Sequence, residues 1–202
     1  PRAGGMLRHG MPAYRMPHDV LDRDLKNITA LGVEIRTGTR VESIASLKAQ
    51  GFDAVFVGVG NQIPKVIPLQ GRDLADVTDC MRFLKDSKDG GEMPDLRGKH
   101  VVVLGGGNVA LDVARSAARL ATASVSILCL EDRARMPAHA WEVQEAEEEG
   151  VRLLTSASAK RLLRDASGAA MLEYRAVAKI QFSPEGRLAG FEVAEGSERQ
   201  VP

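Results

Sequence analysis

The chain has 202 residues, with 27 Lys plus Arg against 27 Asp plus Glu, so its formal net charge is zero. A balanced charge argues against a nucleic-acid-binding protein, which usually carries a basic excess, and the sequence has no run of about 18 apolar residues that would span a membrane. The two cysteines, Cys80 and Cys129, form no C-x-x-C pair, which excludes a disulfide framework or a four-cysteine metal site within these residues. No basic-then-apolar leader begins the chain, so a reduced, cytoplasmic setting is expected.

The first third of the chain predicts short elements separated by loops. Residues 1–18 are rich in Gly, Pro and Arg and show no helical or strand period, so they predict a loop. Four elements are then expected: a helix from a cap at Asp19 to about Leu31 with Gly32 as its stop, a strand over 33–37, a short helix near 46–50, and a strand over 52–60. The last is a continuous apolar run, typical of a strand buried on both faces. Prolines and a glycine within 61–75 indicate a connection, and we expect a domain boundary near residue 75.

The rest of the chain alternates strands with helices. The pattern predicts strands over 101–104, 125–130 and 151–154, and helices over 79–88, from Asn108 to about Ala121, and from Pro137 to Glu149. Beyond them, turn signals at 165–168 and 183–186 separate shorter strands, as in an antiparallel meander. Alternating strands and helices predict a parallel sheet with right-handed crossovers. The expected fold class is therefore α/β, a Rossmann-like doubly wound parallel sheet with a small antiparallel meander.

One glycine-rich segment carries a specific chemical signal. Gly105, Gly107 and Ala110 form a Gly-x-Gly-x-x-Ala motif directly after a predicted strand and at the start of a predicted helix. In such a motif the first glycine allows a tight turn, the second lets the backbone approach a pyrophosphate, and the small third residue keeps the helix close to the sheet. We expect Asn108 to cap the helix, whose N–H groups and dipole favour an anion. The alternative is a tight turn that binds no ligand.

The end of the next predicted strand should select the coenzyme. Glu131 lies 21 residues after Ala110, about where an acceptor for the ribose 2′-hydroxyl is expected. A carboxylate there accepts hydrogen bonds from a ribose diol and repels a 2′-phosphate, so the sequence favours NAD(H) over NADP(H). Arg133 and Arg135 follow at once, and they leave the opposite choice open because they could neutralise a phosphate. Glu131 could also be a solvated charge at a strand end.

Other groups of residues predict no catalytic or metal site. The four histidines lack metal-ligand spacing, and no Ser–His–Asp arrangement stands out. Cys129 is interpreted as a buried strand residue. The acidic run Glu142–Glu149 predicts a solvated helix face, with Trp141 and either Val143 or Ala146 turned inward.

Several motifs in one order add a family resemblance. In chain order they are G-G-M-L-R-H-G-M-P-A-Y-R-M-P (Gly4–Pro17), L-G-V-E-I (Leu31–Ile35), F-D-A-V-F-V-G-V-G (Phe52–Gly60), V-L-G-G-G-N-V-A-L-D (Val103–Asp112), R-M-P-A (Arg135–Ala138) and E-E-E-G-V (Glu147–Val151). Through them nearly the whole chain resembles a family of flavoproteins that includes the small subunit of glutamate synthase and the N-terminal flavin region of dihydropyrimidine dehydrogenase. In that family a nicotinamide-binding domain is inserted in an FAD-binding domain. The resemblance implies that residues 1–75 are part of an FAD-binding α/β domain and residues 76–202 are the NAD(P)H-binding domain.

The resemblance also implies which residues bind the cofactors. On the flavin side they would be Gly4, Gly5, Met6, Arg15, Val41, Gly58 and Gly60. On the nicotinamide side they would be Gly105, Gly106, Gly107, Asn108, Val109 and Ala110 at the pyrophosphate, with Leu130, Glu131 and Arg133 at the adenosine ribose. Many members carry two arginines, which hold the 2′-phosphate of NADPH, where this chain has Leu130 and Glu131. This departure strengthens the expectation of NADH.

The implied function is that of an FAD-dependent NAD(P)H oxidoreductase. Hydride would pass from the nicotinamide to the flavin, and electrons would leave to iron–sulfur centres or a partner subunit. The family's first FAD fingerprint, its closing FAD segment and its iron–sulfur cysteines are not among these 202 residues, so the chain is interpreted as an internal piece of a longer flavoprotein. The alternatives are a nicotinamide-nucleotide-binding module without flavin or turnover of its own, and a structural scaffold.

Overall fold

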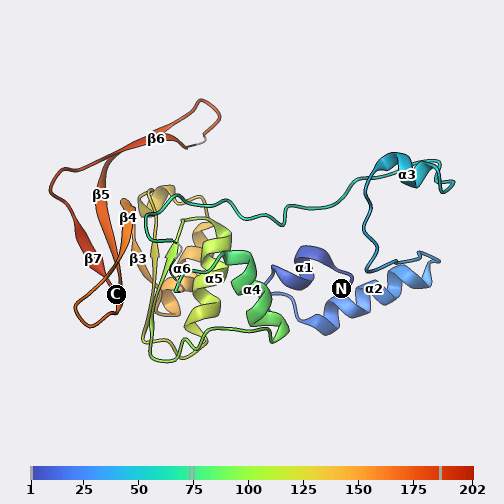
Figure 1. The fold of residues 1–202 in the computed structure, drawn as a ribbon, viewed down its shortest axis with the longest axis horizontal. Coiled ribbons are helices and arrows are strands. Elements are labelled where there is room, and N and C mark those ends of the chain that lie inside the picture. The colour runs from blue at the N-terminus through green and yellow to red at the C-terminus, as the bar shows by residue number, and fades with distance from the viewer. Residues whose placement is uncertain (1, 73, 75, 187) are drawn as a thin grey trace. The chain divides into compact units, whose positions relative to one another are not determined.

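The computed structural model describes residues 2–72, 74, 76–186 and 188–202, and it divides into two compact units, Pro1–Pro64 and Lys65–Pro202 (Figure 1). The division falls inside the connection predicted over 61–75, whereas the assignment of the first unit to an FAD-binding domain stays a prediction. In the part of the chain that the structure describes, no helix combines the length and the apolar character that a membrane crossing requires.

The described residues of the first unit form the helices α1 (Gly5–His9), α2 (His18–Ala30) and α3 (Ile44–Lys48). The prediction of a loop throughout residues 1–18 is wrong, because α1 lies within it. The side chain of Arg8 is buried and fixes this turn of helix: its Nε donates to the carbonyl oxygen of Ala3 at 2.6 Å, and its guanidinium pairs with Asp22 of α2. A long-range ion pair of this kind leaves no periodic signal in a sequence. α2 begins at His18, after Pro17, and not from a cap at Asp19.

The two strands predicted in this unit, over 33–37 and 52–60, are wrong. Neither segment pairs with a strand among the described residues, and much of the apolar run is exposed: the exposed fraction is 95% for Phe56 and 75% for Val59. The physical reason is that cross-strand hydrogen bonds and side-chain pairs stabilise a strand, and a single segment cannot supply them. The local pattern shows only the propensity of these residues for a strand.

A three-stranded parallel sheet forms the centre of the second unit. Its strands are β1 (His100–Leu104), β2 (Ser124–Leu128) and β3 (Arg152–Leu154), in the spatial order β1-β2-β3. The helices of this unit are α4 (Cys80–Asp89), α5 (Asn108–Ala118) and α6 (Ala140–Glu148), the last preceded by the 3₁₀ helix η1 (Arg133–Arg135). The predicted strand–helix alternation is confirmed, with ends displaced by a few residues.

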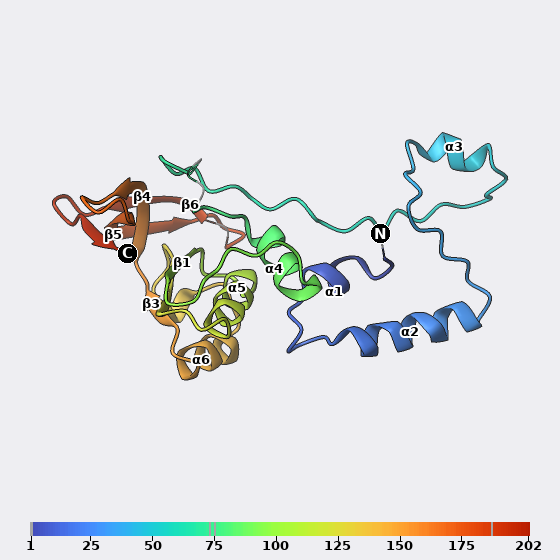
Figure 2. The same ribbon diagram turned by 60° about the horizontal axis from the view of Figure 1, so that its bottom comes forward.

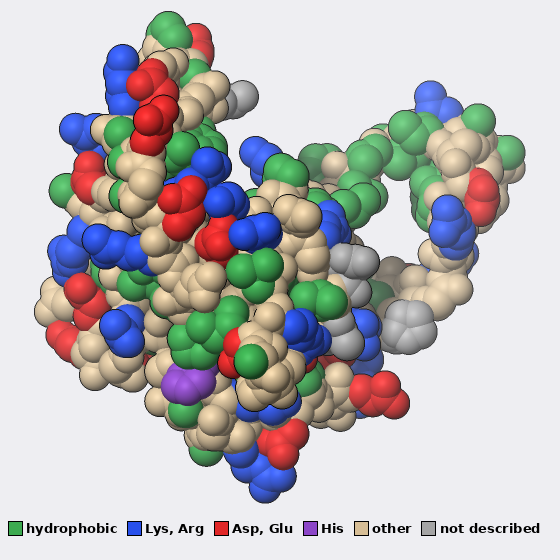
Figure 3. Space-filling view, turned by 60° about the vertical axis from the view of Figure 1, so that its left-hand side comes forward, with side chains coloured by type: hydrophobic (Ala, Val, Ile, Leu, Met, Phe, Trp, Pro, Cys, Tyr) green, Lys and Arg blue, Asp and Glu red, His purple; other side chains and the backbone are tan. Residues whose placement is uncertain are grey.

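Four antiparallel strands follow: β4 (Ala157–Arg164), β5 (Ala170–Phe182), β6 (Leu188–Val193) and β7 (Arg199–Val201). β4, β5 and β6 are neighbours in that order, and β7 also pairs with β5. The turn between β4 and β5 depends on Asp165, whose Oδ1 accepts the N–H groups of Ser167 and Ala169 at 2.8 and 2.9 Å. Acidic and basic side chains are interspersed over this part of the molecule (Figure 3).

Successive side chains of the parallel strands point to opposite faces of their sheet, and both faces are apolar. A different layer covers each face (Figures 1 and 2). On one face, Val103 of β1 belongs to a core with Leu111 of α5 and other buried residues of α4, α5 and α6. On the other face, Leu104 packs with Leu172 and Tyr174 of β5. The helices therefore cover one side and the antiparallel strands cover the other. The α/β fold class with an antiparallel addition is confirmed.

Candidate nicotinamide-nucleotide site

The loop between β1 and α5 has the tight geometry that the glycine motif predicts. Gly105 has a φ of 117°, which residues with a Cβ rarely adopt, and its N–H donates to the carbonyl oxygen of Leu128 at 2.9 Å. This bond continues the pairing with β2 one residue beyond β1. Gly107 is the N-cap of α5, and its carbonyl oxygen accepts the N–H groups of Ala110 and Leu111 at 2.9 and 3.2 Å. The chain thus turns directly from strand to helix.

The three glycines differ in what surrounds them. A Cβ added to Gly106 would lie 3.0 Å from the Cβ of Cys129 and 3.4 Å from Oε2 of Glu131, so the loop backbone lies against the residues that follow β2. A Cβ added to Gly107 would meet no atom within 4 Å, so this side of the loop is open. The structure therefore places the Glu131 carboxylate beside the glycine loop, and its role as the acceptor for a ribose hydroxyl stays a prediction.

The start of α5 offers a set of hydrogen-bond donors. Within the described ranges, the N–H groups of residues 106–109 have no acceptor in the protein. They follow one another at the N-terminal end of an 11-residue helix, where the helix dipole is positive. Consecutive donors at such an end suit a phosphate group.

Asn108 has a different role from the one expected. It is the first residue of α5, not its cap, and its Oδ1 accepts the N–H of His139 at 3.0 Å. The capping prediction is wrong because Gly107 occupies the cap position, and the Asn108 side chain reaches instead to the segment before α6. The N–H of Ala138 also donates to the carbonyl oxygen of Gly106 at 3.2 Å. Both bonds tie the entry of α6 to the glycine loop.

The two arginines that could neutralise a phosphate both have carboxylate partners. Arg133 pairs with Glu147 of α6, and the hydrogen bond raises the pKa of Arg133 and lowers the pKa of Glu147. The Nε of Arg135 lies 3.4 Å from Oδ2 of Asp132, whose Oδ1 accepts the N–H groups of Ala134 and Arg135. Both arginine side chains are more than half exposed, so a ligand could still compete for them.

Cys129 is a buried residue just after β2, with an exposed fraction of 3%. Burial raises the pKa of its thiol to about 12, and the charge of Glu131 acts in the same direction. Its Sγ donates to the carbonyl oxygen of Glu131 at 3.5 Å. A buried thiol with a raised pKa is a poor nucleophile at neutral pH, and Cys129 packs against Gly106 of the glycine loop.

α6 turns a different face inward from the one expected. Val143 and Ala146 are buried as predicted, but Trp141 is 53% exposed and Glu142 is only 5% exposed. The predicted inward position of Trp141 is wrong because its ring stacks on that of His139 at the entry of α6, with an angle of 7° between the ring planes and 6.2 Å between the centroids. This exposed aromatic pair therefore lies in the segment that is bonded to the glycine loop.

The candidate flavin-side residues lie in the first unit, on separate segments. Gly4 precedes α1 and has a φ of 120°, while Gly5 and Met6 begin that helix. The guanidinium of Arg15 lies 5.6 Å from the centroid of the Tyr14 ring. Val41 is 54% exposed, and Gly58 and Gly60 lie in the segment that was expected to be a strand. Their role toward a flavin stays a prediction.

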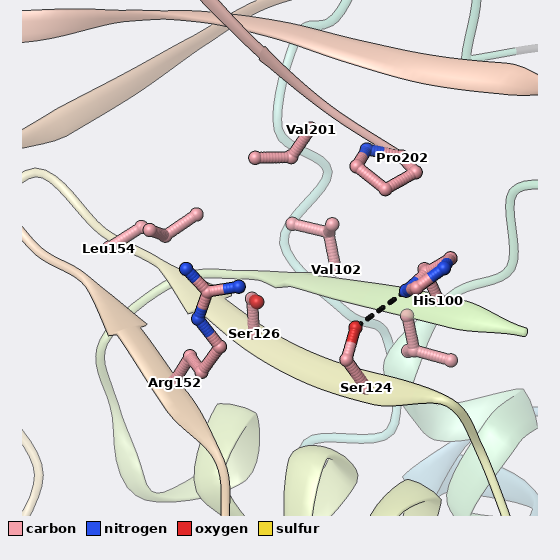
Figure 4. Close-up of a pocket in the computed structure, with 9 residues that line it drawn as sticks. His100, Val102, Ser124, Ser126, Arg152, Leu154, Val201 and Pro202 are labelled. Carbon is pink, nitrogen blue, oxygen red and sulfur yellow. Dashed lines mark hydrogen bonds between the residues drawn. The ribbon is translucent and has the colours of Figure 1, made fainter.

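One cavity, of about 170 Å³, lies away from the glycine loop, at the amino ends of the parallel strands (Figure 4). His100, Ser124 and Arg152, the first residues of the three strands, contribute to its wall, and His100 Nδ1 lies 2.7 Å from Ser124 Oγ. Ligands of parallel α/β sheets bind at the carboxyl ends of the strands, where the glycine loop is. This cavity is therefore separate from the candidate nucleotide site.

Residues 45–181 match the family described as pyridine nucleotide-disulphide oxidoreductase, which is more than half of the chain. The chain belongs to this family. Three relatives are the NADP(+)-dependent formate dehydrogenase subunit beta of Moorella thermoacetica, the glutamate synthase [NADPH] small chain of Escherichia coli and the NAD-dependent dihydropyrimidine dehydrogenase subunit PreT of Salmonella typhimurium. In that order, they are 42%, 34% and 32% identical to this chain, over 75%, 75% and 76% of its length. The matched region covers 22%, 34% and 37% of the relatives' own lengths. The resemblance to glutamate synthase small subunits and dihydropyrimidine dehydrogenases is confirmed, and the chain spans less than two fifths of these relatives.

Among solved structures, Mycobacterium tuberculosis FprA in complex with NADPH is similar in fold. Its TM-score is 0.67 with 16% sequence identity, over 98% of this chain and 59% of that one. At this identity the likeness concerns the fold alone.

Proposed function

We propose that this chain is the nicotinamide-nucleotide-binding part of an FAD-dependent NAD(P)H oxidoreductase. The observation that supports it most is one juxtaposition in the second unit. The N–H groups of residues 106–109 have no acceptor among the described residues, Gly107 has an open side, and the Glu131 carboxylate lies beside Gly106. The first two fit a pyrophosphate and the third fits a ribose diol. Membership of the pyridine nucleotide-disulphide oxidoreductase family supports the same assignment.

In this proposal the residues of the chain bind and orient the coenzyme. The N–H groups of Gly106, Gly107, Asn108 and Val109 hold the pyrophosphate, Ala110 lets α5 approach the sheet, and Glu131 accepts from the ribose hydroxyls. When bound, nicotinamide and flavin supply the hydride chemistry themselves, so no side chain need act as acid, base or nucleophile. The flavin would be held by the longer protein, with the first unit contributing Gly4–Met6, Arg15, Val41, Gly58 and Gly60. Electrons would pass on to iron–sulfur centres of a partner subunit or domain.

For the coenzyme we propose NADH, because Glu131 places a negative charge where NADPH would carry its 2′-phosphate. The names of two relatives specify NADP(+) or NADPH and lean against this choice, whereas a third is named NAD-dependent. Glu131→Arg should shift the ratio of the NADPH and NADH dissociation constants toward NADPH by about tenfold or more, or at least ~1.4 kcal/mol.

The matched control is Glu148→Arg, which makes the same charge change on an exposed residue of α6. It should leave the ratio within about twofold, since the charge of an exposed residue outside the candidate site is screened by salt. Equal ratios for wild type and Glu131→Arg would remove Glu131 from the selection of the coenzyme.

The alternative is a nucleotide-binding module without flavin, and it is favoured by the location of the candidate pyrophosphate and ribose groups, all in the second unit. The visible spectrum of the purified 202-residue chain separates the two. A flavin band near ~450 nm supports the oxidoreductase, whereas a colourless chain that binds NADH supports the module. If NADH also fails to raise the melting temperature, both proposals are wrong and a scaffold role is left.

A further inference from the structure

The cavity at the amino ends of the parallel strands lies on the face of the sheet that meets the antiparallel layer. In the register of the sheet, Val102, Ser126 and Arg152 are paired neighbours and form one row across β1, β2 and β3. Two residues further along each strand, and therefore on the same face, the next row is entirely leucine: Leu104, Leu128 and Leu154. The leucine row belongs to the core with β5, whereas the first row brings a hydroxyl and a guanidinium to the wall of the cavity.

The polar side chains of this row have no use within the protein. Ser126 is only 8% exposed, and Figure 4 shows its Oγ and the Arg152 guanidinium on the side of the sheet that faces Val201. Among the residues that the structure describes, neither side chain has a hydrogen-bond or ion-pair partner. Buried polar groups are nearly always hydrogen-bonded, so a molecule in the cavity is the expected partner of Ser126.

The charge of the lining is positive, and its remaining surface is largely apolar. Arg152 is exposed at the first position of β3, and a guanidinium stays charged and binds carboxylates through two parallel hydrogen bonds. None of the described residues that line the cavity is acidic. Apolar side chains complete the wall: Val102, Leu154, Val201 and Pro202.

The volume of the cavity limits the size of its ligand. At about 170 Å³ it is close to the ~150 Å³ that admits a benzene ring, and it is far too small for a dinucleotide. The hydrogen bond between His100 Nδ1 and Ser124 Oγ, at 2.7 Å, joins the first residues of β1 and β2. Figure 4 shows this pair and Arg152 on the two sides of Ser126, so polar groups stand at both edges of the cavity.

We propose that this cavity binds a small monocarboxylate at a site separate from the coenzyme. The carboxylate pairs with the guanidinium of Arg152 and accepts from the hydroxyl of Ser126. An apolar body of about the size of a benzene ring then packs on Val102, Leu154 and Val201. Free phosphate fits less well, because it has no apolar body to cover these side chains. The ligand contacts both the parallel sheet and β7, so its binding stabilises the packing of the two layers and does not depend on a nicotinamide nucleotide.

Calorimetric titration of the 202-residue chain with three probes tests the charge and the apolar part of the site. Benzoate carries the carboxylate and the ring, benzamide is its neutral counterpart of the same shape, and inorganic phosphate is an anion without an apolar body. Benzoate should bind at least tenfold more tightly than either. In a proton–nitrogen correlation spectrum, benzoate should shift the amide signals of residues 124–126 and 152–154 and leave those of residues 105–109 unchanged, because the glycine loop lies at the opposite end of the strands.

Two substitutions test the residues that would hold the carboxylate. Arg152→Gln should weaken benzoate at least tenfold and leave benzamide within twofold. The matched control is Arg199→Gln, the same change at an exposed residue of β7 that does not line the cavity, and it should alter neither affinity. Ser126→Ala should weaken benzoate at least threefold without lowering the melting temperature, because the lost hydroxyl has no partner among the described residues.

Three results would each overturn the inference: no binding of benzoate, equal affinities for benzoate and either of the other two probes, or wild-type benzoate affinity of Arg152→Gln. Shifts at residues 105–109 instead of 124–126 would place the ligand in the candidate nucleotide site and overturn it as well. Arg152→Gln alters an exposed side chain, and Ser126→Ala is an independent second variant should it not fold. Because no nucleotide enters these measurements, their failure leaves the proposed function intact.

Discussion

Replacing Gly107 with alanine should weaken nucleotide binding and leave stability unchanged, whereas the same change at Gly106 should destabilise the fold. Gly107 has φ −91° and ψ 173°, which alanine adopts without strain, and an added Cβ meets no atom within 4 Å. Fewer unfolded conformations favour alanine by about 0.4–1 kcal/mol, and replacing glycine with alanine at the N-cap costs roughly 0.5–1 kcal/mol in the opposite direction. The net change in the free energy of unfolding is therefore about zero, within ~0.5 kcal/mol.

At Gly106 the added Cβ would lie 3.0 Å from the Cβ of Cys129, an atom attached to backbone that cannot rotate away. Cys129 cannot shift readily either, because its N–H donates to Leu154 at 3.1 Å and its carbonyl oxygen accepts from Ala157 at 2.8 Å. Overpacking of this kind costs about 1–3 kcal/mol. The melting temperature of the second unit should fall by roughly 4 °C for each kcal/mol.

Thermal denaturation and NADH titration of both variants test this pair of predictions. The fluorescence of Trp141, the single tryptophan of the chain, can follow the titration. Gly107→Ala should bind NADH at least tenfold more weakly, because its Cβ occupies the open side of the loop. Wild-type affinity of Gly107→Ala would refute the close approach of a ligand to the loop, and a wild-type melting temperature for Gly106→Ala would refute the packing described around Cys129.

Two further predictions concern the ionic contacts of the second unit. Arg115, whose side chain is 8% exposed, joins α5 to Glu145 and Glu149 at 2.5 and 2.6 Å. Arg115→Ala should therefore lower the free energy of unfolding by about 2 kcal/mol in urea denaturation, and Arg115→Met by less, because methionine keeps the buried aliphatic packing. Wild-type stability of both variants would contradict a role for these ion pairs. Hydrogen bonds from Lys160 and Arg161 lower the pKa of the buried Glu173 carboxyl from 4.5 to about 2, so this group stabilises the fold above its unfolded pKa and the contribution is lost as pH falls from 4.5 toward 2. The melting temperature of Glu173→Gln should fall less than that of the wild type between pH 4.5 and pH 2. An identical fall in both proteins would contradict the role of Glu173 in the pH dependence of stability.

Elements that depend on local pattern were predictable from the sequence, and elements that depend on a distant partner were not. The strand–loop–helix at Gly105–Ala110 follows from residues that lie next to one another, and the spacing to Glu131 follows from one helix and one strand. The segments 33–37 and 52–60 have equally strong strand patterns, yet they form no strand among the described residues, because a pattern does not supply a neighbour. The helix α1 does have a distant partner, but the local pattern does not show it. The buried Arg8 that holds this helix pairs with Asp22 in another helix, so the sequence alone predicts a loop there.

Coenzyme selection shows the same limit within the site itself. The sequence identifies Glu131 from its distance to the glycine motif, but Lys179 comes from β5, and no spacing rule connects that strand with the end of β2. In the structure Ser156 makes the connection, through one hydrogen bond to Glu131 and one to Val177. Glu131, which in our proposal would repel a 2′-phosphate, and the basic Arg135 and Lys179, which would attract one, thus come from three separate parts of the chain. In our proposal, the balance between NADH and NADPH would therefore depend on Arg135 and Lys179 as well as on residue 131.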